Sequence, residues 1–123
     1  MRRLLQVVAL LVVVMLTACI AHGDPTKAIP VATIAAKQTA TRVVIVLPGR
    51  ADDLGRLRAS GISDAIQGVW PDADVVFAEV TVDYYKQGDA SRRLHDEVIA
   101  PARTRGYREV WLCLLYTSDA ADE

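Results

Sequence analysis

Residues 41–53, TRVVIVLPGRADD, decide the fold class of this chain of 123 residues. They contain an unbroken apolar run at residues 43–47, in which four of the five side chains are β-branched. Such a run is typical of a strand that is buried on both faces of a parallel sheet. The pair Pro48 and Gly49 ends the strand. We therefore predict an α/β protein whose first parallel strand lies here.

Downstream of this strand, helical and strand patterns alternate. The order strand, helix, strand, helix, strand predicts a parallel sheet with right-handed crossover helices, as an incomplete three-layer sandwich. Ligands of such sheets bind at the carboxyl ends of the strands. The predicted elements are a helix over residues 54–70 interrupted at Ser60 and Gly61, a strand over 75–78, a loop over 82–90, a helix over 91–106 that Pro101 kinks or splits, and a strand over 108–112.

The N-terminal segment has the pattern of an export signal. Arg2 and Arg3 precede an apolar run over residues 4–16, and small residues follow it. The run is shorter than the roughly 20 residues of a membrane-spanning helix. We therefore predict a cleaved signal peptide over residues 1–18, with an uncleaved anchor helix as the alternative.

The sequence Leu-Thr-Ala-Cys at residues 16–19 resembles the lipobox of bacterial lipoproteins. In that family the cysteine is acylated and the chain is cut just before it. The resemblance implies that Cys19 carries the lipid, that membrane lipid is a partner, and that the protein is held in the bacterial cell envelope. Residues 19–40 mix Gly, Pro, Thr, Ala and Lys without a period, so we predict a lipid-anchored linker in which His22 is solvated.

Charge and composition exclude several classes of partner. The chain has 14 basic and 15 acidic residues, a net charge of −1, and no basic stripe. Nothing therefore favours nucleic acid as a partner. No pattern of metal ligands is present, and the loop after the first strand lacks the glycines or the Lys-Ser pair of a phosphate loop. We expect neither a metal nor a cofactor.

Residues 113–123, at the end of the chain, are predicted to be a non-native tail. Their sequence, CLLYTSDAADE, can be back-translated into a string that resembles the adapter of transposon-based sequencing libraries, and all eleven residues fit. The resemblance implies a non-native tail, with natural sequence only up to Leu112 and no biological role for Cys113. The alternative is a genuine strand end with an acidic tail.

Residues 41–112 resemble the N-terminal part of the α/β-hydrolase fold. In that family an early strand ends in a loop, often His-Gly, whose backbone N–H groups help to form the oxyanion hole. The strand after the second helix runs into the G-x-S-x-G turn that presents the nucleophilic serine. The resemblance implies an esterase-like acyl hydrolase of small ester substrates. Its serine, acid and histidine are expected beyond Leu112, so the chain itself would be inactive, and Pro48 departs from the histidine of many members.

The loop after the first strand is the candidate oxyanion hole. Gly49 lets the backbone approach a ligand closely, and the resemblance assigns the N–H donor to Arg50. Each such donor is worth a few kcal/mol in the transition state. One alternative is an ordinary strand-to-helix turn in which Asp52 or Asp53 caps the helix. Another is a small doubly wound, flavodoxin-like binding domain that holds an anionic ligand on the loop from Pro48 to Asp53.

For three further groups of residues the sequence favours a role outside catalysis. Ser63 lies in GISDA, residues 61–65, which lacks the last glycine of the G-x-S-x-G motif and falls in a helical stretch. His95 and Asp96 are neighbours on a helix, so we expect them to point apart on a solvated face. Tyr84 and Tyr85 either line a pocket or pack against the domain, and the sequence favours packing.

Overall fold

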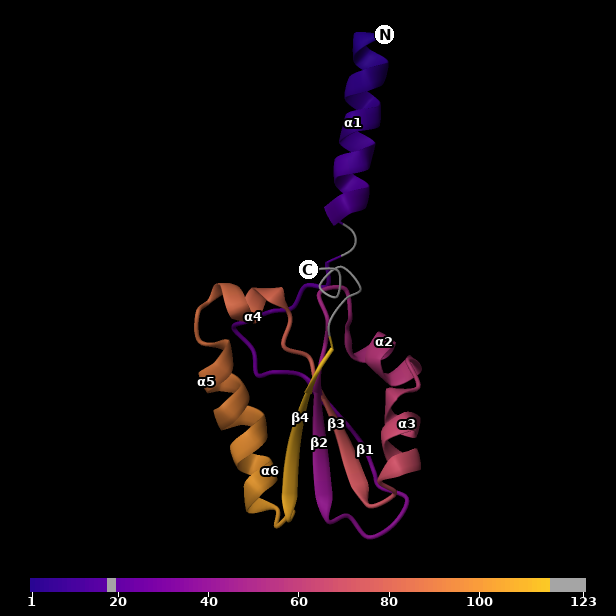
Figure 1. Cartoon of the computed structure of the whole chain (residues 1–123). Coiled ribbons are helices and arrows are strands. Elements are labelled where there is room, and N and C mark those ends of the chain that lie inside the picture. The colour runs from indigo at the N-terminus through magenta and orange to yellow at the C-terminus, as the bar shows by residue number, and fades with distance from the viewer. Residues whose placement is uncertain (18–19, 116–123) are drawn as a thin grey trace.

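The sheet has four strands and is mixed rather than purely parallel. The computed structural model describes residues 1–17 and 20–115. The strands are β1 (Val31–Ile34), β2 (Arg42–Leu47), β3 (Ala73–Ala78) and β4 (Glu109–Leu114), in the spatial order β1-β3-β2-β4 (Figure 1). β2 runs parallel to both β3 and β4, as predicted, whereas β1 is antiparallel to β3. The α/β class with parallel crossovers is thus found, with an antiparallel edge strand added.

The edge strand β1 lies in the segment that was expected to be a linker. Its four residues pair with β3 in the register Val31↔Ala78 to Ile34↔Val75, and Ile29 just before it is 5% exposed. The strand alternates between exposed and intermediate side chains, so it needs no continuous apolar run. A short edge strand with small residues carries too weak a period to stand out in the sequence.

The helices follow the predicted order with two differences. The described helices are α1 (Arg2–Thr17), α2 (Leu54–Ala59), α3 (Ile62–Val69), α4 (Val82–Lys86), α5 (Ala90–Leu94), the π-helical segment η1 (His95–Ile99) and α6 (Ala100–Thr104). The predicted break between α2 and α3 is confirmed, and Gly61 has φ +80° there. The predicted loop over residues 82–90 is wrong in its first half, because α4 forms where Tyr84 packs into the core.

Pro101 does not split the last helical region. The N–H of Ala100 donates to the carbonyl of His95, five residues back, which is the π-helical pattern. Pro101 then falls in the first turn of α6, where its missing N–H costs little. The helical region is therefore irregular before Pro101, in the π-helical segment, and it continues through the proline.

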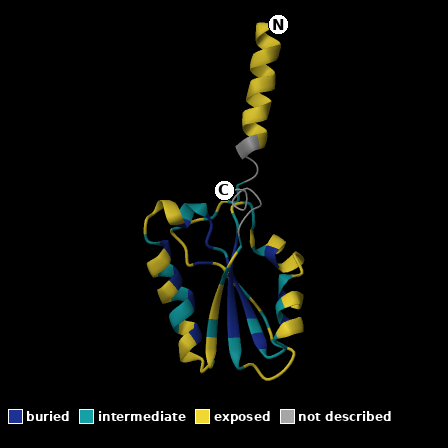
Figure 2. Cartoon of the chain, in the orientation of Figure 1, coloured by how far each residue is buried: buried dark blue, intermediate teal, exposed yellow. Residues whose placement is uncertain are grey.

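Two hydrophobic clusters cover the two faces of the sheet. Figure 2 shows the buried residues concentrated on the strands that lie between the two groups of helices. Alternate residues of β2 serve them: Val43, Ile45 and Leu47 face α4 to α6, while Val44 and Val46 face α2 and α3. All five of these side chains are at most 4% exposed. The predicted burial of this strand on both faces is confirmed.

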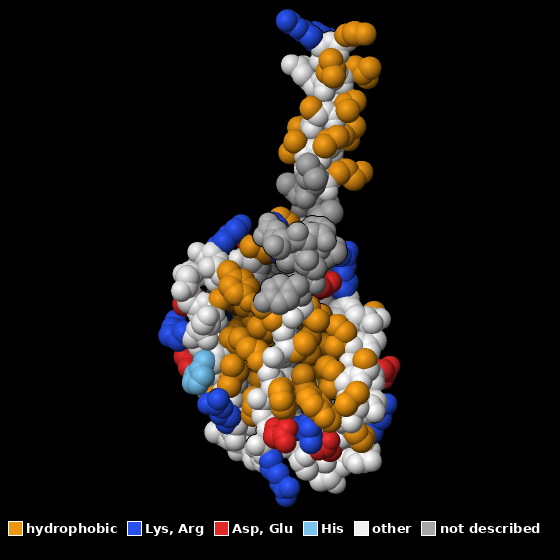
Figure 3. Space-filling view, in the orientation of Figure 1, with side chains coloured by type: hydrophobic (Ala, Val, Ile, Leu, Met, Phe, Trp, Pro, Cys, Tyr) orange, Lys and Arg blue, Asp and Glu red, His pale blue; other side chains and the backbone are white. Residues whose placement is uncertain are grey.

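The other edge strand, β4, is longer than predicted and poorly covered. It runs to Leu114, with Cys113 opposite Val46 and Leu114 opposite Leu47. Trp111, Leu112 and Leu114 are each about half exposed. Figure 3 shows hydrophobic side chains gathered between the two helical layers, where β4 lies in Figure 1. Of the predicted non-native tail, residues 116–123 lie outside the described part of the chain.

Two glycines at the ends of α3 provide a matched test of this backbone. An added Cβ meets nothing within 4 Å at either Gly61 or Gly68, but only Gly61 has a positive φ. We predict that Gly68→Ala raises the free energy of unfolding by about 0.5–1 kcal/mol, because alanine favours a helix. Gly61→Ala should lower it by about 1 kcal/mol, because alanine is strained at positive φ.

Urea denaturation of the two variants beside the parent chain measures both changes. Shifts of the same sign at the two positions would contradict the assigned helix boundary.

Candidate functional site at the carboxyl edge of the sheet

The strand order creates a switch point between β2 and β4. The chain crosses from β2 to β3 on one side and then returns past β2 to β4 on the other. In open α/β sheets a ligand crevice lies outside the carboxyl ends of the two strands at such a point. The ends are aligned here, since Leu47 pairs with Leu114 and the N–H of Leu115 donates to the carbonyl of Leu47 at 3.3 Å. This edge is therefore the candidate site.

The loop that follows β2 forms a closed turn. The N–H of Gly49 donates to Oδ2 of Asp52 at 3.3 Å, and the N–H of Asp52 donates to the carbonyl of Gly49 at 3.2 Å. Arg50 is exposed, and its N–H has no acceptor within the described residues. Of the two residues predicted for the oxyanion hole, Gly49 thus has an occupied amide and Arg50 an open one.

Carboxylates already satisfy the donors at the start of α2. Oδ1 of Asp53 accepts from the N–H of Arg56 at 2.9 Å, so the predicted capping role is confirmed for Asp53. Oε2 of Glu79, at the end of β3, accepts from the N–H of Leu54 at 2.7 Å. Together with Asp52 these groups place negative charge beside the loop, and negative charge opposes the binding of an anion.

A hollow of about 380 Å³ adjoins the loop. Its lining comes from the loop, from the chain after β3 and from α4: Pro48, Gly49, Arg50, Val80, Val82 and Tyr85. Tyr85 is 52% exposed here, and partial burial raises the pKa of its hydroxyl. Tyr84 instead is 1% exposed and donates from its hydroxyl to the carbonyl of Asp24 at 3.1 Å. Packing is thus confirmed for Tyr84, whereas Tyr85 lines the hollow.

The other sequence candidates lie away from this edge or on the surface. Ser63 is 8% exposed in α3, and no histidine of the described chain bonds to it. His95 and Asp96 do not point apart, because Nδ1 of His95 lies 3.0 Å from Oδ1 of Asp96. The predicted solvated face is nevertheless confirmed, since both side chains are more than half exposed.

His22 is paired rather than simply solvated. Its Nδ1 lies 3.1 Å from Oδ2 of Asp83, which also accepts from the N–H of Gly23 at 2.9 Å. The hydrogen bond from the Gly23 amide is the main cause that holds the pKa of the Asp83 carboxyl below its usual value. The contact with His22 lowers this pKa further. No group of three or more metal-ligating side chains occurs among residues 1–17 and 20–115. Cys19 lies outside the described residues.

Residues 20–30, which we call the strap, are docked on α4, α5 and η1. Arg93 donates from Nη2 to the carbonyl of Lys27 at 2.6 Å and from Nη1 to that of Pro25. Oε2 of Glu97 accepts from the N–H of Ile29 at 2.7 Å, and its other oxygen pairs with Arg93 at 2.9 Å. The hydrogen bond from the Ile29 amide is the main cause that lowers the pKa of Glu97, and the ion pair with Arg93 lowers it further. The sequence pattern did not reveal this docking, because its acceptors are mostly backbone carbonyls.

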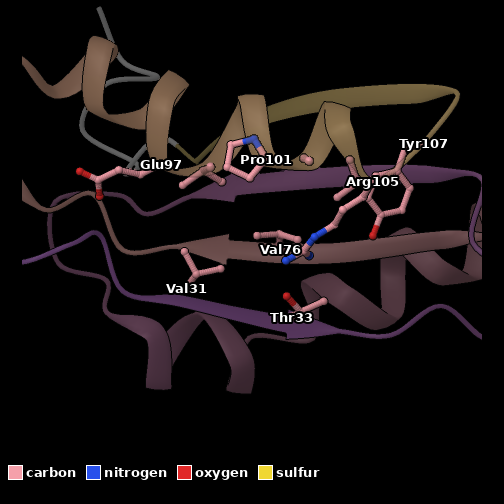
Figure 4. A pocket seen from close by; sticks show the side chains of 10 residues that line it. Val31, Thr33, Val76, Glu97, Pro101, Arg105 and Tyr107 are labelled. Atoms are coloured by element: carbon pink, nitrogen blue, oxygen red, sulfur yellow. The ribbon is translucent and has the colours of Figure 1, made fainter.

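A second, smaller hollow of about 90 Å³ lies between α6 and the sheet (Figure 4). Its walls are mostly apolar, and the polar groups labelled in Figure 4 include Glu97, Arg105 and Tyr107. Glu97 is committed to the strap, and the hydroxyl of Tyr107 donates to Oδ2 of Asp74. Glu97 and Tyr107 at this hollow therefore serve the fold, and the carboxyl edge remains the better site.

Comparison of the chain with family models, curated proteins and solved structures finds no match. Among the described residues, no helix has both the length and the apolar character needed to cross a membrane.

We predict that acid releases the strap. The folded-state pKa values of Asp83 and Glu97 are lowered, so docking stabilises the chain above the ordinary carboxyl pKa and is lost as the pH falls through the lowered values. Amide hydrogen exchange over residues 21–29 should therefore be slow at neutral pH and accelerate below about pH 4, after correction for the intrinsic exchange rate.

Asp83→Asn with Glu97→Gln should remove most of this pH dependence, whereas Asp64→Asn, on α3, is the matched control. Equal protection of the strap at pH 7 and at about pH 3 would contradict the prediction.

Proposed function

We propose that this chain is the N-terminal part of a membrane-anchored serine hydrolase of the α/β-hydrolase fold, acting on carboxylic esters. The observation that carries the proposal is the placement of β2 beside β4. They are parallel neighbours, and their carboxyl ends align at Leu47 and Leu114. In the proposal, the loop after β2 supplies the oxyanion donor and the turn after β4 presents the serine.

Acyl transfer requires this proximity. The nucleophile and the oxyanion donors must lie about 3 Å from the same reacting group. Groups that follow two neighbouring strands start about 4.8 Å apart, which is close enough. Had β4 paired beyond β3 instead, the two loops would be separated by about twice that distance. The strand order is thus compatible with one shared carbonyl between the loops.

Within the proposed site, the open amide of Arg50 is the oxyanion donor. The Gly49–Asp52 turn holds it at the end of β2, and the absence of a side chain at Gly49 leaves room for the substrate. The hollow lined by Val80, Val82 and Tyr85 would accept the apolar part of an ester. The amide of Gly49 becomes a second donor only when Asp52 releases it.

The exposure of β4 also favours the proposal. After Glu109, the remaining side chains of β4 are apolar on both faces, and Leu112 is 54% exposed. Edge strands in solvent usually carry charges or proline, which block pairing with other strands. We infer that further protein covers β4 and supplies the serine, acid and histidine, and that the adapter-like residues 113–123 stand in place of that sequence.

The second candidate is a small binding domain that holds an anion at the loop from Pro48 to Asp53. The exposed side chain and open amide of Arg50 favour it. The carboxylates of Asp52, Asp53 and Glu79 oppose it, because they occupy neighbouring N–H groups. A tetrahedral oxyanion needs only one or two donors, so we favour the hydrolase.

The proposed anchor is a lipid on Cys19 in the bacterial cell envelope. Helix α1 precedes it and exposes apolar side chains along its length, including Leu4, Leu10 and Val13, each more than half exposed. Apolar exposure of this extent favours a segment that is removed or embedded in lipid.

We predict that a bacterial host incorporates labelled palmitate into the chain at Cys19. Cys19→Ala should abolish the label, because the cysteine thiol is the acylation site that the lipobox resemblance implies. Cys113→Ser is the matched control and should retain it. Full labelling of the Cys19→Ala variant, measured by gel autoradiography, would contradict the anchor.

A long read of the source DNA across the Leu112 codon tests the catalytic half of the proposal. We predict a G-x-S-x-G sequence within a few residues. The continued gene product should hydrolyse nitrophenyl esters, and alanine in place of its elbow serine should abolish turnover. The 123-residue chain should show none.

Two results would overturn this proposal. One is a confirmed reading of residues 113–123 followed by a stop codon. The other is turnover by the 123-residue chain that Ser63→Ala abolishes.

A further inference from the structure

We propose that the carboxyl edge of the sheet is a membrane-facing surface, held against the lipid bilayer that carries the anchor. The surface consists of the loop 48–53, the hollow beside it, and α4. The inference rests on the lipid at Cys19 in the proposed function and deepens it, because it names the environment from which the site takes its ligand.

The first step is that the strap is fixed at its beginning. The N–H of Ala21 donates to the carbonyl of Arg50 at 2.8 Å, which joins the strap to the candidate site itself. Two residues on, Gly23 lies so close to the chain before α4 that an added Cβ would be 2.7 Å from Oγ1 of Thr81. The strap backbone therefore lies directly against the carboxyl edge.

The second step is that the rest of the strap is clamped. Tyr84, Arg93 and Glu97 bond to backbone groups of the strap as far as Ile29. These contacts come from three successive helical elements, so no single side-chain movement frees the segment. The strap consequently cannot act as a long flexible leash while it is docked.

The third step is the length of chain between the strap and the lipid. Two Cα–Cα steps separate Ala21 from Cys19, so the acylated residue lies at most about 7 Å from Ala21. The six-residue strand β2 is about 20 Å long, so the opposite edge of the sheet lies well beyond that reach. Figure 1 agrees, since α1 leaves from the end of the molecule at which β2 and β4 end.

The chemistry of this edge suits a bilayer surface. Arg50 and Lys86 are exposed and basic, as anionic headgroups require. Tyr85 is a half-exposed aromatic, and such rings favour the membrane interface. Four carboxylates also lie at this edge, and each accepts a hydrogen bond from a nearby N–H group. Asp83 is bonded to Gly23 and His22, and Asp52, Asp53 and Glu79 accept from the N–H groups of Gly49, Arg56 and Leu54. The basic side chains of Arg50 and Lys86, by contrast, form no ion pair within the described residues. In this arrangement, an amphiphilic ester in the same leaflet would reach the hollow over a shorter distance than an ester dissolved in the surrounding water.

The test compares two labelled positions at opposite edges of the sheet. Arg50→Cys and Lys37→Cys both replace exposed basic residues, and Lys37 lies between β1 and β2 at the amino edge. Each is made in the lipidated full chain with Cys113→Ser, labelled with a fluorophore, and placed on phosphatidylethanolamine–phosphatidylglycerol vesicles that contain a headgroup-nitroxide lipid. We expect quenching several-fold stronger at position 50 than at position 37.

A third variant tests the tether itself. A flexible Gly-Ser insert of about six residues between Ile20 and Ala21 should reduce the difference between the two positions while flotation with the vesicles is retained. An undiminished difference would contradict the role of the short tether. Equal quenching at both positions of a chain that floats overturns the membrane-facing surface alone, whereas a chain that fails to float overturns the anchor as well.

Discussion

The burial of β2 between two hydrophobic clusters is the constraint on which the rest of the structure depends. Its side chains alternate into both cores, and both of its edges are paired, with β3 on one side and β4 on the other. A strand in this position forces helices onto both faces of the sheet and sends consecutive crossovers in opposite directions. The switch point, and with it the candidate site at the end of β2, follows from that arrangement.

Hydrogen bonds from polar groups then fix the strap against the rest of the fold. The loop after β2 forms a hydrogen bond with the strap, and the strap is bonded in turn to α4, α5 and η1. Most of these bonds join side chains to backbone groups, so each one removes freedom from a segment without regular structure of its own. The strap thereby has a fixed position relative to the candidate site, so the proposed lipid anchor would lie near that site.

Much of the architecture could be predicted from local pattern. The apolar run of β2, the break at Gly61 and the cap at Asp53 each depend on neighbouring residues, and each is found. The strand β1 and the helix α4 were missed, because partners distant in the sequence stabilise them. In the candidate site, the sequence pattern points to the loop after β2, and its role stays a prediction. The occupation of the Gly49 amide by Asp52 depends on side-chain geometry that no pattern shows.

The sequence by itself determined the α/β class, the central strand and the loop that ends it, because hydrophobic period and turn residues act over a few positions. Only the tertiary structure decided that β4 lies beside β2, that Tyr84 packs while Tyr85 lines the hollow, and that residues 20–30 are docked. The physical reason is range. Strand order and docking arise from contacts between segments up to about 70 positions apart, and local propensity contains no information on such contacts.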